Sequence, residues 1–127
     1  MLRALLVRHP HIDKILDGDK TWEIRGAKTT IRGTIGLIAS GSGTVIGVCD
    51  VVDCVGPLTQ EQFQKNASKA GIQEGKAKLG HYRQTYGWVL ANPKYLKKPV
   101  PYEHPVGAVI WVTLDPDVEG KILNQST

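Results

Sequence analysis

The apolar residues fall in short runs separated by glycine, proline and polar residues, a pattern typical of strands alternating with short helices. Six of these runs are rich in the β-branched, aliphatic or aromatic residues that strands favour. The predicted strands are Leu2–Val7, Lys20–Arg25, Thr34–Ala39, Thr44–Val55, Tyr86–Ala91 and Gly107–Leu114. The glycine-containing turn Ser40–Gly43 between the third and the fourth predicts a β-hairpin.

Helical spacing of apolar residues, together with capping residues, predicts two helices between the strands. The first covers His11–Asp17, with Gly18 as its C-cap. The second covers about Gln60–Ala70, with the Thr59 hydroxyl as its N-cap. Glycines interrupt the chain that follows, so Gly75–Arg83 is expected to form at most a short helix.

These elements predict an α+β fold, a small β-barrel of about six strands with two or three flanking helices. Closing the sheet would remove its exposed strand edges. The proline-rich stretch Asn92–Pro105 is expected to be a loop, and the polar tail after about residue 115 is expected to fray. The chain contains no repeat or linker, so residues 1–127 are expected to form a single domain.

Composition narrows the class of protein. The 127 residues are 41% hydrophobic and 22% charged, which is ordinary for a globular protein and argues against disorder. No apolar run approaches the roughly 20 residues that span a bilayer, so we expect no membrane partner. Cys49 and Cys54 lie roughly 16 Å apart along a straight strand, too far for a disulfide. Unless the chain bends sharply between them they are reduced thiols, which fits a cytoplasmic protein. A monomer is favoured.

The net charge of +4 is unevenly distributed along the chain. Residues 59–98 hold eight basic and two acidic residues, a net charge of +6. Such a stretch can face an anionic partner such as nucleic acid, or it can be a solvated lysine-rich surface. The position of this stretch relative to the candidate site would distinguish a polymeric ligand from a nucleoside-sized one.

The segment Gly18–Arg25 carries the strongest candidate chemistry, because four ionisable residues gather where a helix gives way to a strand. Side chains alternate along a strand, so Glu23 and Arg25 lie on the face opposite Trp22. Lys20 stands at the start of the strand and can turn to either face. One interpretation is a surface ion pair, worth about 0–1 kcal/mol. The other is a recessed group in which the lysine is a base or nucleophile, the carboxyl transfers a proton and the guanidinium holds an oxygen anion.

The order of these residues resembles the signature of the ASCH family, a branch of the PUA-like superfamily. The first part of the resemblance is Pro10, Ile15-Leu16 and Gly18-x-Lys20-Thr21-x-Glu23-x-Arg25, and the second is Trp88-Val89-Leu90-x-x-Pro93, Pro99-x-Pro101, Gly107 and Trp111. The resemblance extends over nearly the whole chain, from about residue 2 to residue 114. It implies a β-barrel with flanking helices and a cleft beside the first helix that suits RNA or a modified nucleobase.

Some bacterial proteins of similar sequence are amidohydrolases that remove the acyl group from N4-acetylcytidine with a lysine, a threonine and a glutamate. The resemblance therefore implies a nucleoside substrate and neither a metal nor another cofactor. The catalytic lysine matches Lys20, but Glu23 stands where the threonine is expected. Glu61 and, further along, Glu74 are candidates for the glutamate, although neither aligns convincingly. Glu23 could instead supply the carboxylate, with Lys20 or an activated water attacking the amide.

Five further residues are candidates for substrate binding. They are Arg25, Thr21, Arg8, His9 and Ser40, which belong to the predicted strands or to the loops that follow them. The alternative functions are an RNA-binding module and a metal-independent ribonuclease. Both gain from the mixture of tyrosines and basic residues after residue 75, which can bind single-stranded RNA by stacking and charge.

Overall fold

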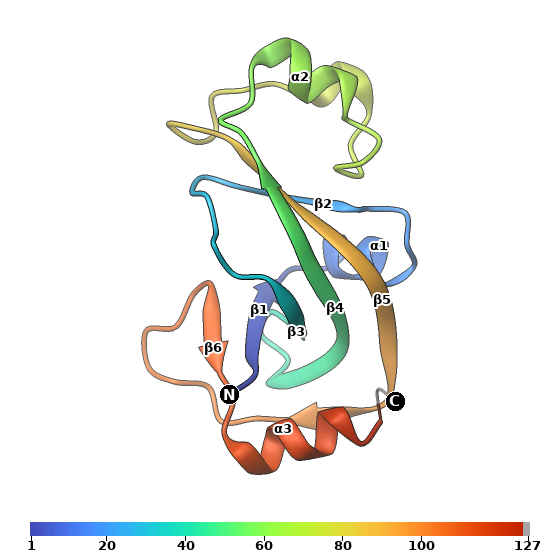
Figure 1. Cartoon of the computed structure of the whole chain (residues 1–127), viewed down its shortest axis with the longest axis vertical. Coiled ribbons are helices and arrows are strands. Elements are labelled where there is room, and N and C mark those ends of the chain that lie inside the picture. Colours follow the sequence, from blue (N-terminus) through green and yellow to red (C-terminus); the bar gives the residue numbers. More distant parts are fainter. Residues whose placement is uncertain (126–127) are drawn as a thin grey trace.

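Six strands form one curled sheet in the computed structural model, which describes residues 1–125. The strands are β1 (Arg3–Val7), β2 (Trp22–Arg25), β3 (Gly33–Ala39), β4 (Thr44–Val55), β5 (Tyr86–Pro101) and β6 (Trp111–Thr113). Their order is β2-β5-β4-β3-β1-β6, with β1 and β3 parallel and all other neighbours antiparallel. The sheet curls into a half-barrel, so that β2 passes beyond the carboxyl end of β1 (Figure 1). The predicted α+β barrel-like fold is confirmed.

Helices cover both faces of this sheet. Helix α1 (His11–Leu16) buries its apolar residues in one cluster, and α3 (Pro116–Leu123) buries its own in another. In β1, Leu5 and Val7 join the cluster with α1, whereas Ala4 and Leu6 join the cluster with α3. A strand that is buried on both faces reads as a continuous apolar run, as β1 does in the sequence.

Residues 56–85 leave the sheet between β4 and β5 and form a lobe beyond β2 (Figure 1, top). The lobe contains α2 (Gln60–Lys65) and the short 3-10 helix η1 (Glu74–Lys76). Its apolar side chains, among them Phe63 and Ala70, pack with Trp22 of β2 in a third cluster. The Lys69 carbonyl accepts hydrogen bonds from the N–H groups of Thr21 and Trp22 at 2.8 and 2.9 Å. The lobe is therefore fastened to the start of β2, next to the candidate chemistry.

The expected loop at residues 92–105 is wrong, because β5 continues to Pro101 and pairs with β4 along its length. Leu96 and Val100 hold this half of β5 to the core, at 6% and 3% exposure. Its prolines are accommodated by irregular pairing, since the register with β4 shifts around Pro93 and again before Val100. Shifts of this kind remove the need for a proline to donate a ladder hydrogen bond.

The second helix and the last strand are shorter than predicted. Helix α2 starts at Gln60 on the predicted Thr59 cap, whose hydroxyl accepts a hydrogen bond from the Gln62 N–H at 3.1 Å, but it ends at Lys65 and continues as turns. Strand β6 covers only residues 111–113, because residues 105–108 form a turn closed by a hydrogen bond from the Ala108 N–H to the Pro105 carbonyl.

The tail that was expected to fray is largely helical within the described residues. Asp115 caps α3 by accepting a hydrogen bond from the Val118 N–H at 3.0 Å, and Pro116 occupies the first turn, where proline is favoured. Val118 and Ile122, four residues apart, point into the cluster shared with β1, β3 and β5. The aspartate–proline pair and this spacing were the sequence signals for the helix.

Replacing Ile122 by alanine tests whether α3 belongs to the core. The side chain is 0% exposed, so we expect Ile122→Ala to lower the free energy of unfolding by about 2–5 kcal/mol, as large-to-small core substitutions do. Urea unfolding measures this loss. Val106→Ala, at a fully exposed apolar position, is the matched control and should change stability by less than about 0.5 kcal/mol. A loss as small as the control's would mean that α3 does not contribute to the core.

Candidate functional site

A cavity of about 630 Å³ opens where β2 passes the end of β1. Its walls come from the end of β1, the start of α1, β2, the hairpin turn, the lobe and the loop before β6. A volume of this size is typical of small-molecule sites. The cavity therefore lies at the junction of the sheet, the first helix and the lobe, next to the segment with the candidate chemistry.

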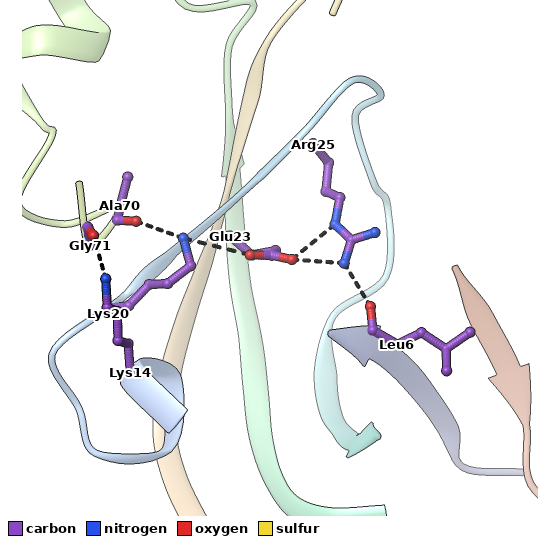
Figure 2. Close-up of polar contacts among 7 residues, drawn as sticks. All are labelled: Leu6, Lys14, Lys20, Glu23, Arg25, Ala70 and Gly71. Atoms are coloured by element: carbon purple, nitrogen blue, oxygen red, sulfur yellow. Dashed lines mark hydrogen bonds and ion pairs between the residues drawn. The ribbon is translucent and has the colours of Figure 1, made fainter. Parts of the chain in front are cut away.

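Lys20, Glu23 and Arg25 meet at this cavity, as one of the two interpretations of the sequence required (Figure 2). The Glu23 Oε2 atom accepts hydrogen bonds from Arg25 Nε at 3.0 Å and from Arg25 Nη2 at 2.7 Å. The Glu23 Oε1 atom lies 3.6 Å from Lys20 Nζ. Glu23 is 6% exposed and Lys20 3%, so this is a buried group of two basic side chains around one carboxylate rather than a surface ion pair.

Arg25 spans the gap between β2 and β1. Its Nη2 atom also donates to the Leu6 carbonyl at 2.9 Å, which joins two strands that are not neighbours in the sheet (Figure 2). Its guanidinium carbon lies 5.7 Å from the ring centre of Trp88, within the range of a cation–π contact. The Nη1 atom donates to no group among the described residues. One end of the guanidinium is thus fixed, and the Nη1 end keeps unused hydrogen-bond donors.

Lys20 is held from the other side by the lobe. Its Nζ atom donates to the Ala70 carbonyl at 2.7 Å, and Lys14 of α1 donates to the neighbouring Gly71 carbonyl at 3.1 Å (Figure 2). Gly71 has a φ of +70°, which disfavours any other residue, and a Cβ there would lie 3.3 Å from the Cβ of Lys20. The turn at Ala70 and Gly71, in the middle of the lobe, therefore fixes the position of the Lys20 amine.

The charge balance of this group determines its protonation. Arg25, which donates two hydrogen bonds to one oxygen of Glu23, already compensates the carboxylate, so a charged Lys20 leaves a net positive charge in a buried place. Burial lowers the pKa of Lys20 below its usual value. Glu23 opposes this shift, and the positive charges of Lys14 and Arg25 add to it. The uncharged amine is consequently favoured more than in an exposed lysine.

The other candidate residues divide into two groups. Arg8 and Ser40 line the cavity. Four others are exposed and do not line it: Thr21, His9, Glu61 and Glu74. The His9 Nδ1 atom instead lies 2.6 Å from a carboxylate oxygen of Asp13. Thr21 precedes β2, which begins at Trp22.

Several residues outside the predicted catalytic and substrate-binding set also line the cavity. His11 lies at the start of α1, and burial, assisted by the charge of Lys20, lowers its pKa. Lys76, Lys78, His81 and Tyr82 come from the lobe. The Tyr82 ring lies against Gly26, where an added Cβ would approach the ring to 2.6 Å. The mixture of basic and tyrosine residues after residue 75 had indicated this part of the wall as a candidate for RNA binding. The fold then brings two of the eight basic residues of segment 59–98, Lys76 and Lys78, to the cavity.

The two cysteines lie outside the cavity. Cys49 and Cys54 of β4 are free thiols, and burial raises the pKa of Cys49 to about 12, so its thiol stays protonated and unreactive at neutral pH. Among residues 1–125, no three His, Cys, Asp or Glu side chains are grouped in a way that could hold a metal ion. In the same part of the chain, no helix is both long and apolar enough to cross a membrane.

The half-barrel sheet, with helices on both faces and a polar cleft beside α1, defines a small PUA-like domain. The chain belongs to the ASCH domain family, whose model matches residues 5–100. The crystal structure of ASCH from Zymomonas mobilis is similar, with a TM-score of 0.74 and 14% identity over 96% of this chain and 93% of that one. Two mutant proteins of ZmASCH, from the same organism, are also similar, each with a TM-score of 0.71 and 14% identity over 96% of this chain. The match covers 96% of the tyrosine-to-phenylalanine mutant chain and 94% of the serine-to-alanine mutant chain. These likenesses concern the fold. No curated protein matches the chain.

The lowered pKa of Lys20 predicts a pH-dependent stability. Between the lowered value and the usual 10.5, the unfolded chain binds more protons at this lysine than the folded protein does, so the contribution of Lys20 to stability rises with pH. We expect the free energy of unfolding of the wild type, minus that of Lys20→Met, to increase from about pH 7 to about pH 10. Urea unfolding at both pH values measures this difference. Lys97→Met on the exposed part of β5 is the matched control, and a difference for Lys20→Met that stays constant or falls would contradict the prediction.

Proposed function

We propose that the protein is an amidohydrolase that removes the acyl group from N4-acetylcytidine-type nucleosides, releasing cytidine and a carboxylic acid. The observation that carries the proposal is the buried Lys20 amine, held 3.6 Å from Glu23 in a cavity of nucleoside size. Amide hydrolysis needs a base to activate water, a donor for the oxygen anion and a proton for the leaving nitrogen. Lys20 and Arg25 can supply all three.

The uncharged Lys20 amine has two N–H groups and one lone pair. The Ala70 carbonyl and the Glu23 carboxylate can each face one N–H group, so the lone pair remains to accept a proton. In the proposed first step, a water molecule gives this proton to Lys20 while its oxygen bonds to the carbonyl carbon of the substrate. The resulting ammonium is stabilised by Glu23. Lys20 is thus the general base of the reaction.

Arg25 and the same lysine complete the cycle. The free Nη1 atom of Arg25 can donate to the carbonyl oxygen as it becomes negative, and its other contacts keep the guanidinium in place. When the carbon–nitrogen bond breaks, the ammonium of Lys20 returns its proton to the leaving nitrogen. The products are a carboxylic acid and the free exocyclic amine, and Lys20 is again uncharged.

The alternative is an RNA-binding or ribonuclease function. The observation that favours it is the presence of Lys76, Lys78 and Tyr82 on the wall of the same cavity, where they could bind phosphate and stack on a base. The basic segment 59–98 is only partly at the site, since Lys94, Lys97 and Lys98 lie on β5 outside the cavity. This distribution favours a ligand of limited size over a long polymer.

Substitution of Lys20 tests the proposed mechanism. Lys20→Arg keeps a positive charge but removes a group that can lose its proton, so we expect the release of cytidine from N4-acetylcytidine to fall by at least about 100-fold. Lys20→Ala should abolish it. Chromatography measures the cytidine released, and circular dichroism verifies the fold. In the wild type, the rate should rise with pH through the lowered pKa of Lys20.

The matched control is Lys97→Arg, which makes the same exchange at an exposed residue of β5 and should leave the rate unchanged. Full activity of a folded Lys20→Arg protein would remove Lys20 from the role of base. If the wild type released no cytidine but retarded a short RNA in a gel, the RNA-binding alternative would replace the proposal.

A further inference from the structure

The cavity is far more basic than a neutral nucleoside requires. Arg8, Lys76 and Lys78 line it in addition to the Lys20–Glu23–Arg25 group. Among the described residues, Glu23 is the only acidic side chain in the wall, and it already faces Lys20 and Arg25. A partly enclosed cleft with one sign of charge concentrates the field and attracts ions of the opposite sign. The wall charge therefore favours an anionic ligand.

Lys76 and Lys78 are also placed by a defined local structure. Ala77 between them is fully buried in the core of the lobe, so it anchors the chain at this point. The Lys78 N–H donates to the Lys76 carbonyl at 3.0 Å, and Ala77 has φ −80° and ψ 85°, which is close to an inverse γ-turn. The two lysines therefore flank one tight turn.

A side chain of α2 fixes this turn to the rest of the lobe. The Gln60 Nε2 atom donates to the Ala77 carbonyl at 2.6 Å, and its Oε1 atom accepts from the Leu79 N–H at 2.8 Å. One amide thus holds the backbone on both sides of Lys78. Charged side chains on a fixed backbone lose less freedom when they bind a ligand, which raises affinity.

We propose that Lys76 and Lys78 form a phosphate subsite at the rim of the cavity, so that the site takes a phosphorylated nucleotide in preference to a nucleoside. That the ligand carries a cytosine base rests on the proposed function. That the two lysines bind its phosphate does not depend on it. The phosphate can belong to a free mononucleotide or to one nucleotide of an RNA strand. Both sources present the same negatively charged oxygens to the two ammonium groups.

Binding of reaction products tests the subsite without turnover. Titration calorimetry compares cytidine with cytidine 5′- and 3′-monophosphate, and we expect one monophosphate to bind at least about tenfold more tightly than cytidine. In the double variant Lys76→Ala/Lys78→Ala this preference should fall to within about twofold. The control Lys97→Ala/Lys98→Ala removes the same charge from an exposed part of β5 and should retain the preference. No preference in the wild type, no measurable binding of either monophosphate, or a preference that survives in the Lys76/Lys78 variant would overturn the proposal.

Two further arms separate this inference from the proposed function and identify the source of the phosphate. Cytidine release is measured with N4-acetylcytidine and its monophosphate. If the monophosphates bind preferentially but no substrate is turned over, the phosphate subsite is supported and the amidohydrolase proposal fails. If cytidine is released but the monophosphates are not preferred, the amidohydrolase proposal is supported and the subsite fails. A short single-stranded RNA that binds more tightly than the mononucleotide, with a steeper dependence on salt, would identify a strand as the source. Equal affinity would identify the free nucleotide.

Discussion

The interaction on which the site depends is the burial of the Glu23 carboxylate between the Arg25 guanidinium and the Lys20 amine. A buried carboxylate is strongly destabilising unless charged groups compensate it, and removal of one partner of a buried pair costs about 3–5 kcal/mol. Arg25 supplies the compensation through two hydrogen bonds to one oxygen, and Lys20 faces the other oxygen. Because Arg25 also binds the Leu6 carbonyl and Lys20 binds the Ala70 carbonyl, the same carboxylate connects β1, β2 and the lobe. One charged group therefore sets both the geometry and the electrostatics of the cleft.

The cleft exists because the sheet is bridged here by side chains instead of a backbone ladder. Strand β2 is an edge strand that pairs with β5, and the gap toward β1 is crossed by the long side chain of Arg25. A direct strand pair would bring the two backbones within about 5 Å and leave no room for a ligand. The side-chain bridge keeps the strands apart while still linking them, and the lobe covers one end of the opening. This is a physical reason why the ionisable residues of a short segment lie at a cavity and not on a closed surface.

Much of this arrangement could be predicted from the sequence, because local signals were strong where the chain is regular. The apolar runs located all six strands, and the spacing in Gly18–Arg25 identified Lys20, Glu23 and Arg25. The helix α3 was missed although its capping residues and apolar spacing are local signals, whereas other errors arose where long-range packing overrode a local signal. Prolines suggested a loop after residue 91, but Leu96 and Val100 hold that segment in β5. The placement of His11, Lys76 and Lys78 at the cavity depends on how α1 and the lobe pack, which no local pattern records.

In the proposed amidohydrolase, Glu23 stands where the resemblance implies a threonine, and this difference changes which group can act as nucleophile. A hydroxyl can attack an amide carbonyl after losing its proton, whereas a carboxylate is a weaker nucleophile and would form an anhydride. The Oε2 atom of Glu23 accepts two hydrogen bonds from Arg25, and its Oε1 atom faces Lys20, so its oxygens are already engaged. A carboxylate held in this way stabilises positive charge better than it attacks carbon. The same contacts suit it to a partner that gains and loses a proton, and Lys20 is the neighbour whose pKa burial has lowered. In this site the nucleophile is therefore expected to be water, with the lysine as its base and the carboxylate as the counter-charge of the ammonium that forms.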